Sequence, residues 1–267
     1  AIKNADVGIA MGIAGTEVAR EAAQIVLMDD DFSSIVAGIE EGRAVFSNVQ
    51  KFTSYVLASN VPEIVPFLAF VVLPVPLGLT VIQILTIDLG TDLIPAIGLG
   101  QEPPDGEAMK RPPRGAKGRL LSRSLLVRSY LFLGMVQALW AMAMFFTVLV
   151  AGGWRFGEIP SASDPLYRGA TGITLVSVIF VQIANLVGRR FESRSGLDRG
   201  LVKNPFFVVG VGLELAFAWA VLHFAPLSNA LGTGPVAPMF VALAALGCPL
   251  FLAVDFAAKR LRARAAR

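Results

Sequence analysis

Long apolar segments dominate the chain after its first fifty or so residues. Six of them are long enough to cross the hydrocarbon core of a bilayer, which takes about 20 apolar residues per helix. They cover residues 53–75, 77–99, 125–151, 171–188, 205–224 and 236–256. Because the first begins only after a mixed segment, it is not a signal peptide. The pattern predicts a mostly α-helical membrane protein with six transmembrane helices.

The first 51 residues follow a different pattern, in which short apolar runs alternate with helical periodicity. ADVGIAMG and QIVLM read as strands, and TEVAREAA reads as a helix capped by Thr16. DDDFSSIVAGIEEGRAVFSNVQKF reads as a helix that continues into the first span. This order is typical of the last part of a doubly wound α/β sheet. The sequence therefore predicts an α/β tail with a stalk at 1–51, a membrane domain at 52–258 and a basic tail at 259–267.

The glycines and the aspartates of this tail can each be interpreted as a binding site or as part of the local structure. Gly8, Gly12 and Gly15 lack the G-x-G-x-x-G spacing of a dinucleotide loop, and no G-x-x-x-x-G-K-[ST] occurs. Turn and close-packing glycines are therefore expected. The run DDD at 29–31 is compatible with a metal site. Its place between a strand and a helix favours capping, because carboxylates are stabilised at helix N-termini.

Composition and charge placement agree with a membrane protein. The chain is 55% hydrophobic and 16% charged, whereas a soluble domain is about a quarter charged. The segments 101–128, 189–204 and 259–267 hold seventeen of the 23 Lys and Arg. The positive-inside rule places them, and both termini, in the cytoplasm. The net charge of +3 thus reflects topology and argues against a nucleic-acid partner, and the single cysteine excludes an internal disulfide framework.

Acids and amides stand inside the first two apolar segments. Asp88, Thr91 and Asp92 are spaced i, i+3 and i+4, so on a helix they share one face. Asn60 and Glu63 do the same on the preceding segment. An acid in mid-membrane costs about 2.5–3.5 kcal/mol on insertion scales, and neither segment contains a Lys or Arg to pair with it. The expected partner is therefore a transported cation or protons.

Helix-breaking residues accompany these acids. Pro62 and Pro66 lie in the first span, and Gly90 and Pro95 lie in the second. A proline removes a backbone donor and disturbs the carbonyl four residues earlier. In a membrane such breaks are tolerated where they are buried in protein or line a cavity. Carboxylates beside freed carbonyls are hard oxygen ligands suited to Na⁺, K⁺, Ca²⁺ or protons.

Three polar residues in later spans are less decisive. Gln182 and Asn185 share one face of the fourth span, where they either complete a cation site or hydrogen-bond between helices. Glu214 in the fifth span fits a proton path and a structural acid equally well. These alternatives stay open at the level of sequence.

Three stretches resemble P-type cation-transporting ATPases of the branch that contains the sodium–potassium and calcium pumps. SNVPEIVPF resembles their fifth transmembrane helix, and TIDLGTDLIPAIGLGQEPPDGEAMKRPPR resembles the sixth helix and the loop after it. KNADVGIAMGIAGTEVAREAAQIVLMDDDFSSIVAGIEEGR resembles the end of the HAD-like phosphorylation domain. The resemblance covers essentially the whole chain as the C-terminal part of such a pump, with its spans as helices five to ten.

The resemblance implies a role for each polar residue of the spans. The implied cation ligands are Asn60, Glu63, Asp88, Thr91 and Asp92. The implied auxiliary groups are Tyr55, Ser59, Gln182 and Asn185, the last standing where the sodium pump carries an acid. Acids at both sixth-helix positions favour Na⁺ or K⁺ exchange over Ca²⁺ transport.

The phosphorylated D-K-T-G motif of these pumps does not occur in the 267 residues. The resemblance places ATP and Mg²⁺ mainly on upstream domains, so we expect a fragment that is inert alone and works within an ion-translocating ATPase of the plasma membrane. Its expected partners are the bilayer, those upstream domains and the transported cations. Two alternatives are an ATP-independent cation carrier or channel, against which the α/β tail argues, and a non-catalytic interaction module derived from a pump.

Overall fold

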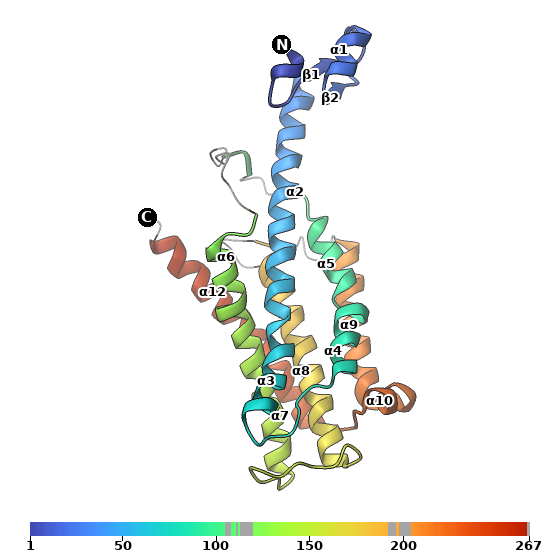
Figure 1. Ribbon diagram of the computed structural model, residues 1–267, viewed down its shortest axis with the longest axis vertical. Helices are drawn as coiled ribbons and strands as arrows, with labels where there is room; N and C mark the ends of the chain where they lie inside the picture. The colour runs from blue at the N-terminus through green and yellow to red at the C-terminus, as the bar shows by residue number, and fades with distance from the viewer. Residues whose placement is uncertain (105–107, 111, 113–119, 192–195, 198–203, 266–267) are drawn as a thin grey trace. The chain divides into compact units, whose positions relative to one another are not determined.

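The computed structural model describes residues 1–104, 108–110, 112, 120–191, 196–197 and 204–265 (Figure 1). The chain divides into two compact units. One comprises residues 1–47 with 103–118, and the other comprises residues 48–102 with 119–267.

The smaller unit contains a parallel two-stranded sheet. β1 (Ile9–Met11) pairs with β2 (Ile25–Leu27), and α1 (Glu17–Ala22) connects them. A 3-10 helix, η1 (Ile2–Asn4), precedes β1. Thr16 caps α1 by accepting a hydrogen bond from a backbone N–H of the first turn at 3.3 Å. The predicted strand, helix and strand are therefore all present, with the predicted cap.

Close packing explains the three glycines around β1. A Cβ at Gly8 would lie 2.5 Å from the side chain of Ile2, and one at Gly12 would lie 2.6 Å from the Leu27 carbonyl oxygen. A Cβ at Gly15 would overlap a carbonyl of β1. No side chain larger than hydrogen fits these positions without a shift of the backbone, as the packing interpretation predicted.

The aspartates at 29–31 tie β2 to the start of α2 (Phe32–Ser59). Asp31 accepts a hydrogen bond from the Ser33 N–H at 2.8 Å, which is the predicted capping role. Asp30, with a φ of 53°, accepts bonds at 2.9 and 2.6 Å from two N–H groups of the loop after β1. These backbone bonds lower the pKa of the Asp30 carboxyl group. The run therefore closes a loop and caps a helix.

Six helical spans are long and apolar enough to cross a membrane, so the predicted number of transmembrane helices is confirmed. They cover Phe32–Val72, Val81–Gly100, Arg123–Ala151, Pro165–Arg189, Pro205–His223 and Pro238–Arg264. Large apolar side chains on their outer faces, such as Leu89, Leu131 and Trp219, are exposed in the chain by itself. Such faces suit contact with lipid, and the chain is an integral membrane protein.

Breaks divide four of the spans into shorter helices. The first consists of α2 and α3 (Val61–Val72), and the second of α4 (Val81–Gly90) and α5 (Leu93–Gly100). The third consists of α6 (Arg123–Val127), the π-helical η3 (Arg128–Gly134) and α7 (Met135–Ala151). The fourth and fifth are the single helices α8 (Pro165–Arg189) and α9 (Pro205–His223). The sixth consists of α11 (Pro238–Ala245) and α12 (Gly247–Ala265), and two short helices, η2 (Ala108–Lys110) and α10 (Ala225–Leu231), lie between spans.

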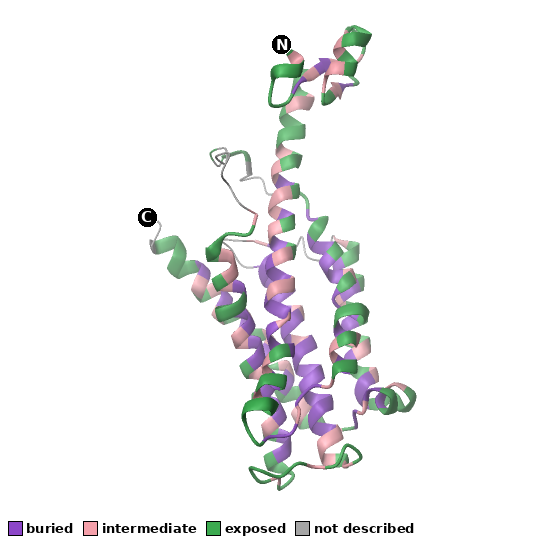
Figure 2. Cartoon of the chain, viewed as in Figure 1, coloured by how far each residue is buried: buried purple, intermediate pink, exposed green. Residues whose placement is uncertain are grey.

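α8 is the central helix of the larger unit. The most apolar stretch of α8 is 89% buried, far more than that of any other span. The helix packs against α7, α9, α11 and α12. Ile173 packs with Phe145 of α7, and Leu175 and Ile179 pack with Val221 of α9. Figure 2 shows the buried positions concentrated in the middle of this bundle. Polar groups on α8 are therefore held away from lipid.

Candidate cation-binding site

Both acid-bearing spans are interrupted beside their acids. Asn60 separates α2 from α3, and Thr91 with Asp92 separates α4 from α5. Pro62 and Pro95 cannot donate the backbone hydrogen bonds that would close the helix across these positions. The breaks therefore place backbone carbonyls without their helical donors next to polar side chains, in the part of the sequence where cation ligands were predicted.

The second break affects the backbone hydrogen bonding of Asp92, and the polar residues around it differ in burial. The Asp92 N–H bonds to the Ile87 carbonyl at 3.1 Å, one residue earlier than in a regular α-helix. Thr91 and Asp92 are buried, whereas Asp88 is exposed in the chain by itself. Asp88 therefore does not share the burial of Thr91 and Asp92 in the chain by itself. Its role as a ligand stays a prediction.

Asp92 lies where three spans meet. It accepts hydrogen bonds from the Tyr55 hydroxyl of α2 at 3.0 Å and from the Gln182 amide of α8 at 3.3 Å. The Asn185 amide donates to the Tyr55 backbone carbonyl at 3.5 Å. Two of the four residues that the resemblance gave as auxiliary groups thus contact one predicted ligand, and a third, Asn185, contacts Tyr55 beside it. The fourth, Ser59, is buried and donates to a carbonyl of its own helix at 3.0 Å.

Glu63 stands in the first turn of α3 and is 5% exposed. Its Oε1 has no hydrogen-bond partner in the part of the chain that the structure describes. It lies within electrostatic range of Asp88 and Asp92, so the three carboxylates would repel one another if all were ionised. A cation between the two breaks would relieve that repulsion.

Gln137 of α7 belongs to the same region, although the sequence reading missed it. Its amide donates to the Ala58 carbonyl at 3.4 Å, which is the carbonyl that Pro62 deprives of its helical donor. Close contact makes this possible, because a Cβ at Gly134 would overlap the side chain of Val61. An amide inside a largely apolar span was the available signal.

The orphan polar atoms of this region are all acceptors. Six buried side-chain oxygens have no hydrogen-bond partner among the described residues. They are Oε1 of Glu63, Gln137 and Gln182, Oδ1 of Asn185, and both carboxylate oxygens of Glu214. A buried group left without a partner costs about 1–3 kcal/mol. Cations and protons satisfy acceptors, so the chemistry of this set is that of a binder of positive charge.

The described carboxylates are too few to coordinate an ion by themselves. Within the described residues, no group of three or more His, Cys, Asp or Glu side chains could hold a metal ion. An ion at the breaks would therefore also need the hydroxyl, amide and backbone oxygens that surround Asp92 and Glu63. Hard ligands of this mixed, mostly neutral kind suit alkali or alkaline-earth cations better than soft metals.

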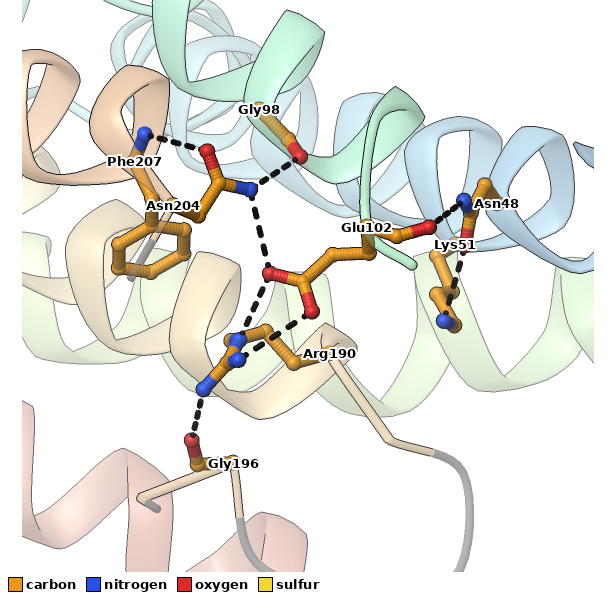
Figure 3. A network of polar contacts seen from close by, with 8 residues as sticks. All are labelled: Asn48, Lys51, Gly98, Glu102, Arg190, Gly196, Asn204 and Phe207. Atoms are coloured by element: carbon orange, nitrogen blue, oxygen red, sulfur yellow. Dashed lines mark hydrogen bonds and ion pairs between the residues drawn. The ribbon is translucent and has the colours of Figure 1, made fainter. Parts of the chain in front are cut away.

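The buried ion pairs of the described chain lie away from these acids. Glu102 accepts from the Arg190 guanidinium at 3.0 and 3.2 Å and from the Asn204 amide at 3.3 Å (Figure 3). Its backbone carbonyl accepts from the Asn48 amide at 2.6 Å, and Asn48 in turn accepts from Lys51 at 3.0 Å. This network ties the end of α5 to α2, α8 and the start of α9. It contains the kind of basic partner that Asp92 and Glu63 lack among the described residues.

Comparison with known proteins supports the sequence resemblance. Residues 76–261 match the family described as "Cation transporting ATPase, C-terminus". The chain belongs to this family. The matched segment contains Asp88, Thr91, Asp92 and both fourth-span amides.

Similar proteins are alpha chains of cation-transporting ATPases. The chain is 38% identical over 243 residues to "Potassium-transporting ATPase alpha chain 2" of Oryctolagus cuniculus. It is 49% identical over 253 residues to "Sodium/potassium-transporting ATPase subunit alpha-4" of Rattus norvegicus. It is 37% identical over 264 residues to "Sodium/potassium-transporting ATPase subunit alpha-3" of Homo sapiens. These alignments cover 82%, 85% and 89% of this chain and 22%, 24% and 26% of the relatives. The chain thus spans about a quarter of the length of the curated relatives it matches.

Proposed function

We propose that this chain is the cation-binding membrane portion of an ATP-driven cation pump, with its site at the two helix breaks. The observation that carries the proposal is the meeting of buried acids and orphan acceptor oxygens without a basic partner among the described residues. The proposed ligands are Asn60, Glu63, Asp88, Thr91 and Asp92. The proposed auxiliary residues are Tyr55, Ser59, Gln182 and Asn185.

Asp92 is the central ligand in this proposal. Tyr55 and Gln182 donate to different oxygens of its carboxylate, which fixes the orientation of the group before an ion arrives. An ion would then bind the remaining lone pairs of the same oxygens. Tyr55 and Gln182 would act as second-shell donors do in other metal sites, by orienting the ligand. Exchange of the ion for protons would keep the carboxylates neutralised in the empty state.

α2 would couple the site to ATP use. It is one continuous helix of 28 residues, which corresponds to about 42 Å at 1.5 Å per residue. Tyr55 stands in its last two turns and contacts Asp92 directly. A movement at the start of α2 would therefore change the position of Tyr55 against Asp92. ATP, Mg²⁺ and the phosphorylated aspartate belong, in this proposal, to domains upstream in the intact pump.

The transported ion is proposed to be Na⁺ or K⁺ in preference to Ca²⁺. Acids at both Asp88 and Asp92 support monovalent exchange, and the names of similar proteins refer to potassium and sodium/potassium transport. The pump is proposed to reside in the plasma membrane, with the N-terminus, the basic loops and the C-terminus cytoplasmic, as the distribution of Lys and Arg supports.

The test is ATPase activity of the full-length pump titrated with Na⁺, K⁺ and buffered Ca²⁺. Na⁺ or K⁺ should activate it, and Asp92→Asn should weaken activation by at least about 100-fold, because it removes an anionic ligand. Glu158→Gln, which neutralises an exposed acid outside the spans, is the matched control.

Two results would contradict the proposal. Wild-type ion activation in Asp92→Asn would remove the site from the two breaks. Activation by Ca²⁺ with no response to Na⁺ or K⁺ would reverse the choice of ion. The 267-residue chain by itself should not hydrolyse ATP, and vanadate-sensitive hydrolysis by that chain would show that it contains its own phosphorylation site.

A further inference from the structure

A second polar site lies between α2, α6, the end of α8 and α12. These elements enclose a cavity of about 170 Å³. A single water needs only ~15 Å³ measured in the same way, so the cavity has room for a group of several atoms. Four basic side chains line it, namely Lys51, Arg128, Arg189 and Arg262. Hydroxyl groups of Ser122 and Ser124 also line it, and no Asp or Glu stands among its described lining residues.

Asp255 of α12 supplies the negative charge near this cavity, and it is shared among several cations. It forms an ion pair with Arg189, another with Arg128 at 3.3 Å and a third with Lys259 at 2.7 Å. One carboxylate thus faces three basic groups, two of which line the cavity. Arg262 adds a further positive charge. The cavity therefore has an excess of positive charge among the residues that the structure describes.

The orphan polar atoms here are donors. Nε of Arg128 and Nε of Arg189 are buried, and neither has a hydrogen-bond partner in the described part of the chain. This is the reverse of the region around Asp92, where every orphan atom is an acceptor. Two buried donors without partners, together with the basic side chains among the described lining residues, are complementary to an anion with several oxygens.

The cavity lies at the level where the apolar spans end. Arg189 is the last residue of α8, Arg128 is near the start of the third span, and Lys51 precedes the first apolar segment. Lipid headgroups occupy this level of a bilayer, and basic pockets between transmembrane helices bind anionic headgroups there. Guanidinium groups match phosphate through paired N–H donors.

We propose that this cavity binds the phosphate group of an anionic ligand, either the headgroup of an anionic phospholipid or a soluble phosphate compound. Arg128 and Arg189 would donate from their unpartnered Nε atoms, and Arg262 would contact the exposed side of the group. The proposal uses none of the residues assigned to cation binding, so it stands or falls independently of the proposed pump function.

The experiment uses the purified 267-residue chain in a neutral detergent. Native mass spectrometry measures binding of dioctanoyl phosphatidylglycerol, dioctanoyl phosphatidylcholine and inorganic phosphate. The anionic lipid should bind more tightly than the zwitterionic lipid. Arg262→Gln should weaken anionic-lipid binding about fivefold, the effect of one basic side chain near an anionic surface, and Arg262→Glu should weaken it further.

Arg260→Gln is the matched control. Arg260 lies on the same helix and its guanidinium stacks over the Phe256 ring at 4.5 Å, but it does not line the cavity. This variant should bind as the wild type does. Arg262 is exposed, so both Arg262 variants should also unfold at the wild-type temperature.

Competition separates the two sources of phosphate. If inorganic phosphate displaces phosphatidylglycerol from the wild type, the cavity accepts soluble phosphate, whereas retention of the lipid identifies a headgroup site. The proposal is overturned if neither the anionic lipid nor phosphate binds in preference to phosphatidylcholine. It is also overturned if Arg260→Gln and Arg262→Gln reduce binding equally.

Discussion

Two sets of buried acids in this protein differ in what neutralises them. Asp255 and Glu102 lie where spans end, and arginines or a lysine hold each of them. Asp92 and Glu63 lie at helix breaks inside the bundle, where hydroxyl and amide groups are the described contacts of Asp92 and one oxygen of Glu63 has none. Burial alone therefore does not separate the acids that form ion pairs from the acids that we propose as cation ligands. The identity of the partner does.

The comparison has an energetic meaning. A buried ion pair is neutral as a unit, and removing one member leaves an uncompensated charge in a place that cannot solvate it. An acid without a basic partner already has this problem in the empty protein. Mutation to a neutral isostere should therefore act in opposite directions at the two kinds of acid.

The largest effect is expected for Asp255→Asn. It leaves Arg189 and Lys259 buried without their carboxylate, and breaking such a pair typically costs about 3–5 kcal/mol of unfolding free energy. Denaturant unfolding of the purified chain in detergent micelles measures the loss. Glu41→Gln, at an exposed position on α2, should change stability by less than about 0.5 kcal/mol. A loss below about 1 kcal/mol for Asp255→Asn would show that the ion pairs of Asp255 do not set it apart from Asp92 and Glu63.

The opposite sign is expected for Asp92→Asn in cation-free buffer. An ionised acid in mid-membrane costs about 2.5–3.5 kcal/mol, and the amide avoids this cost while its oxygen can still accept from Tyr55 or Gln182. Stability should be unchanged or higher by up to about 2 kcal/mol in the same unfolding assay. A loss comparable to that of Asp255→Asn would mean that Asp92 is a structural acid.

A smaller effect is expected at the break itself. Gln137→Leu leaves the Ala58 carbonyl without the donor that replaces the missing N–H of Pro62, which should cost about 1–2 kcal/mol. Gln101→Leu, at an exposed position, is the control for the change of side-chain type. Equal stability of the two variants would show that the Ala58 carbonyl is satisfied in another way, for example by water.

Local patterns predicted the elements of the fold well. The six spans, the two strands and the Thr16 cap follow from periodicity and from the chemistry of neighbouring residues, which act over a few positions along the chain. The site contacts are different in kind. Tyr55 and Asp92 are 37 residues apart and Asn185 and Tyr55 are 130 apart, so no local pattern encodes them. The resemblance to a family singled out these residues, but it did not give their contacts.

Two features could not be read from the sequence for identifiable physical reasons. The spacing of Asp88, Thr91 and Asp92 suits one helical face only if the helix is continuous, and the proline at 95 and the glycine at 90 determine whether it is. Arg190 and Lys259 were counted as charges that orient the chain in the membrane. Their ion pairs with Glu102 and Asp255 depend on which helices become neighbours in three dimensions.

The smallest effect is expected for Asp30, a partly exposed carboxylate. Its pKa lies below the ordinary value of 3.8 because backbone N–H groups, that of Ile13 foremost, donate to it. A lowered pKa in the folded state means that its contribution to stability is present above about pH 4 and is lost as the pH falls through the folded pKa. Hydrogen exchange should show weaker protection of the Ile13 and Ala14 amides in acid, relative to that expected from the intrinsic pH dependence. In Asp30→Asn this extra acid sensitivity should disappear.

Gly134 has a consequence for how the bundle can vary. Its backbone lies against Val61, and a Cβ built on Gly134 would lie 3.0 Å from the Ala58 carbonyl oxygen. The first and third spans can therefore approach this closely only because Gly134 has no side chain. Alanine there would act as a wedge, separating the spans at the break beside Asn60 and drawing Gln137 away from its carbonyl. The geometry around Asn60 and Gln137 thus depends on Gly134, which has no polar side chain. One added carbon at Gly134 should disturb this geometry as much as the loss of a hydrogen bond would.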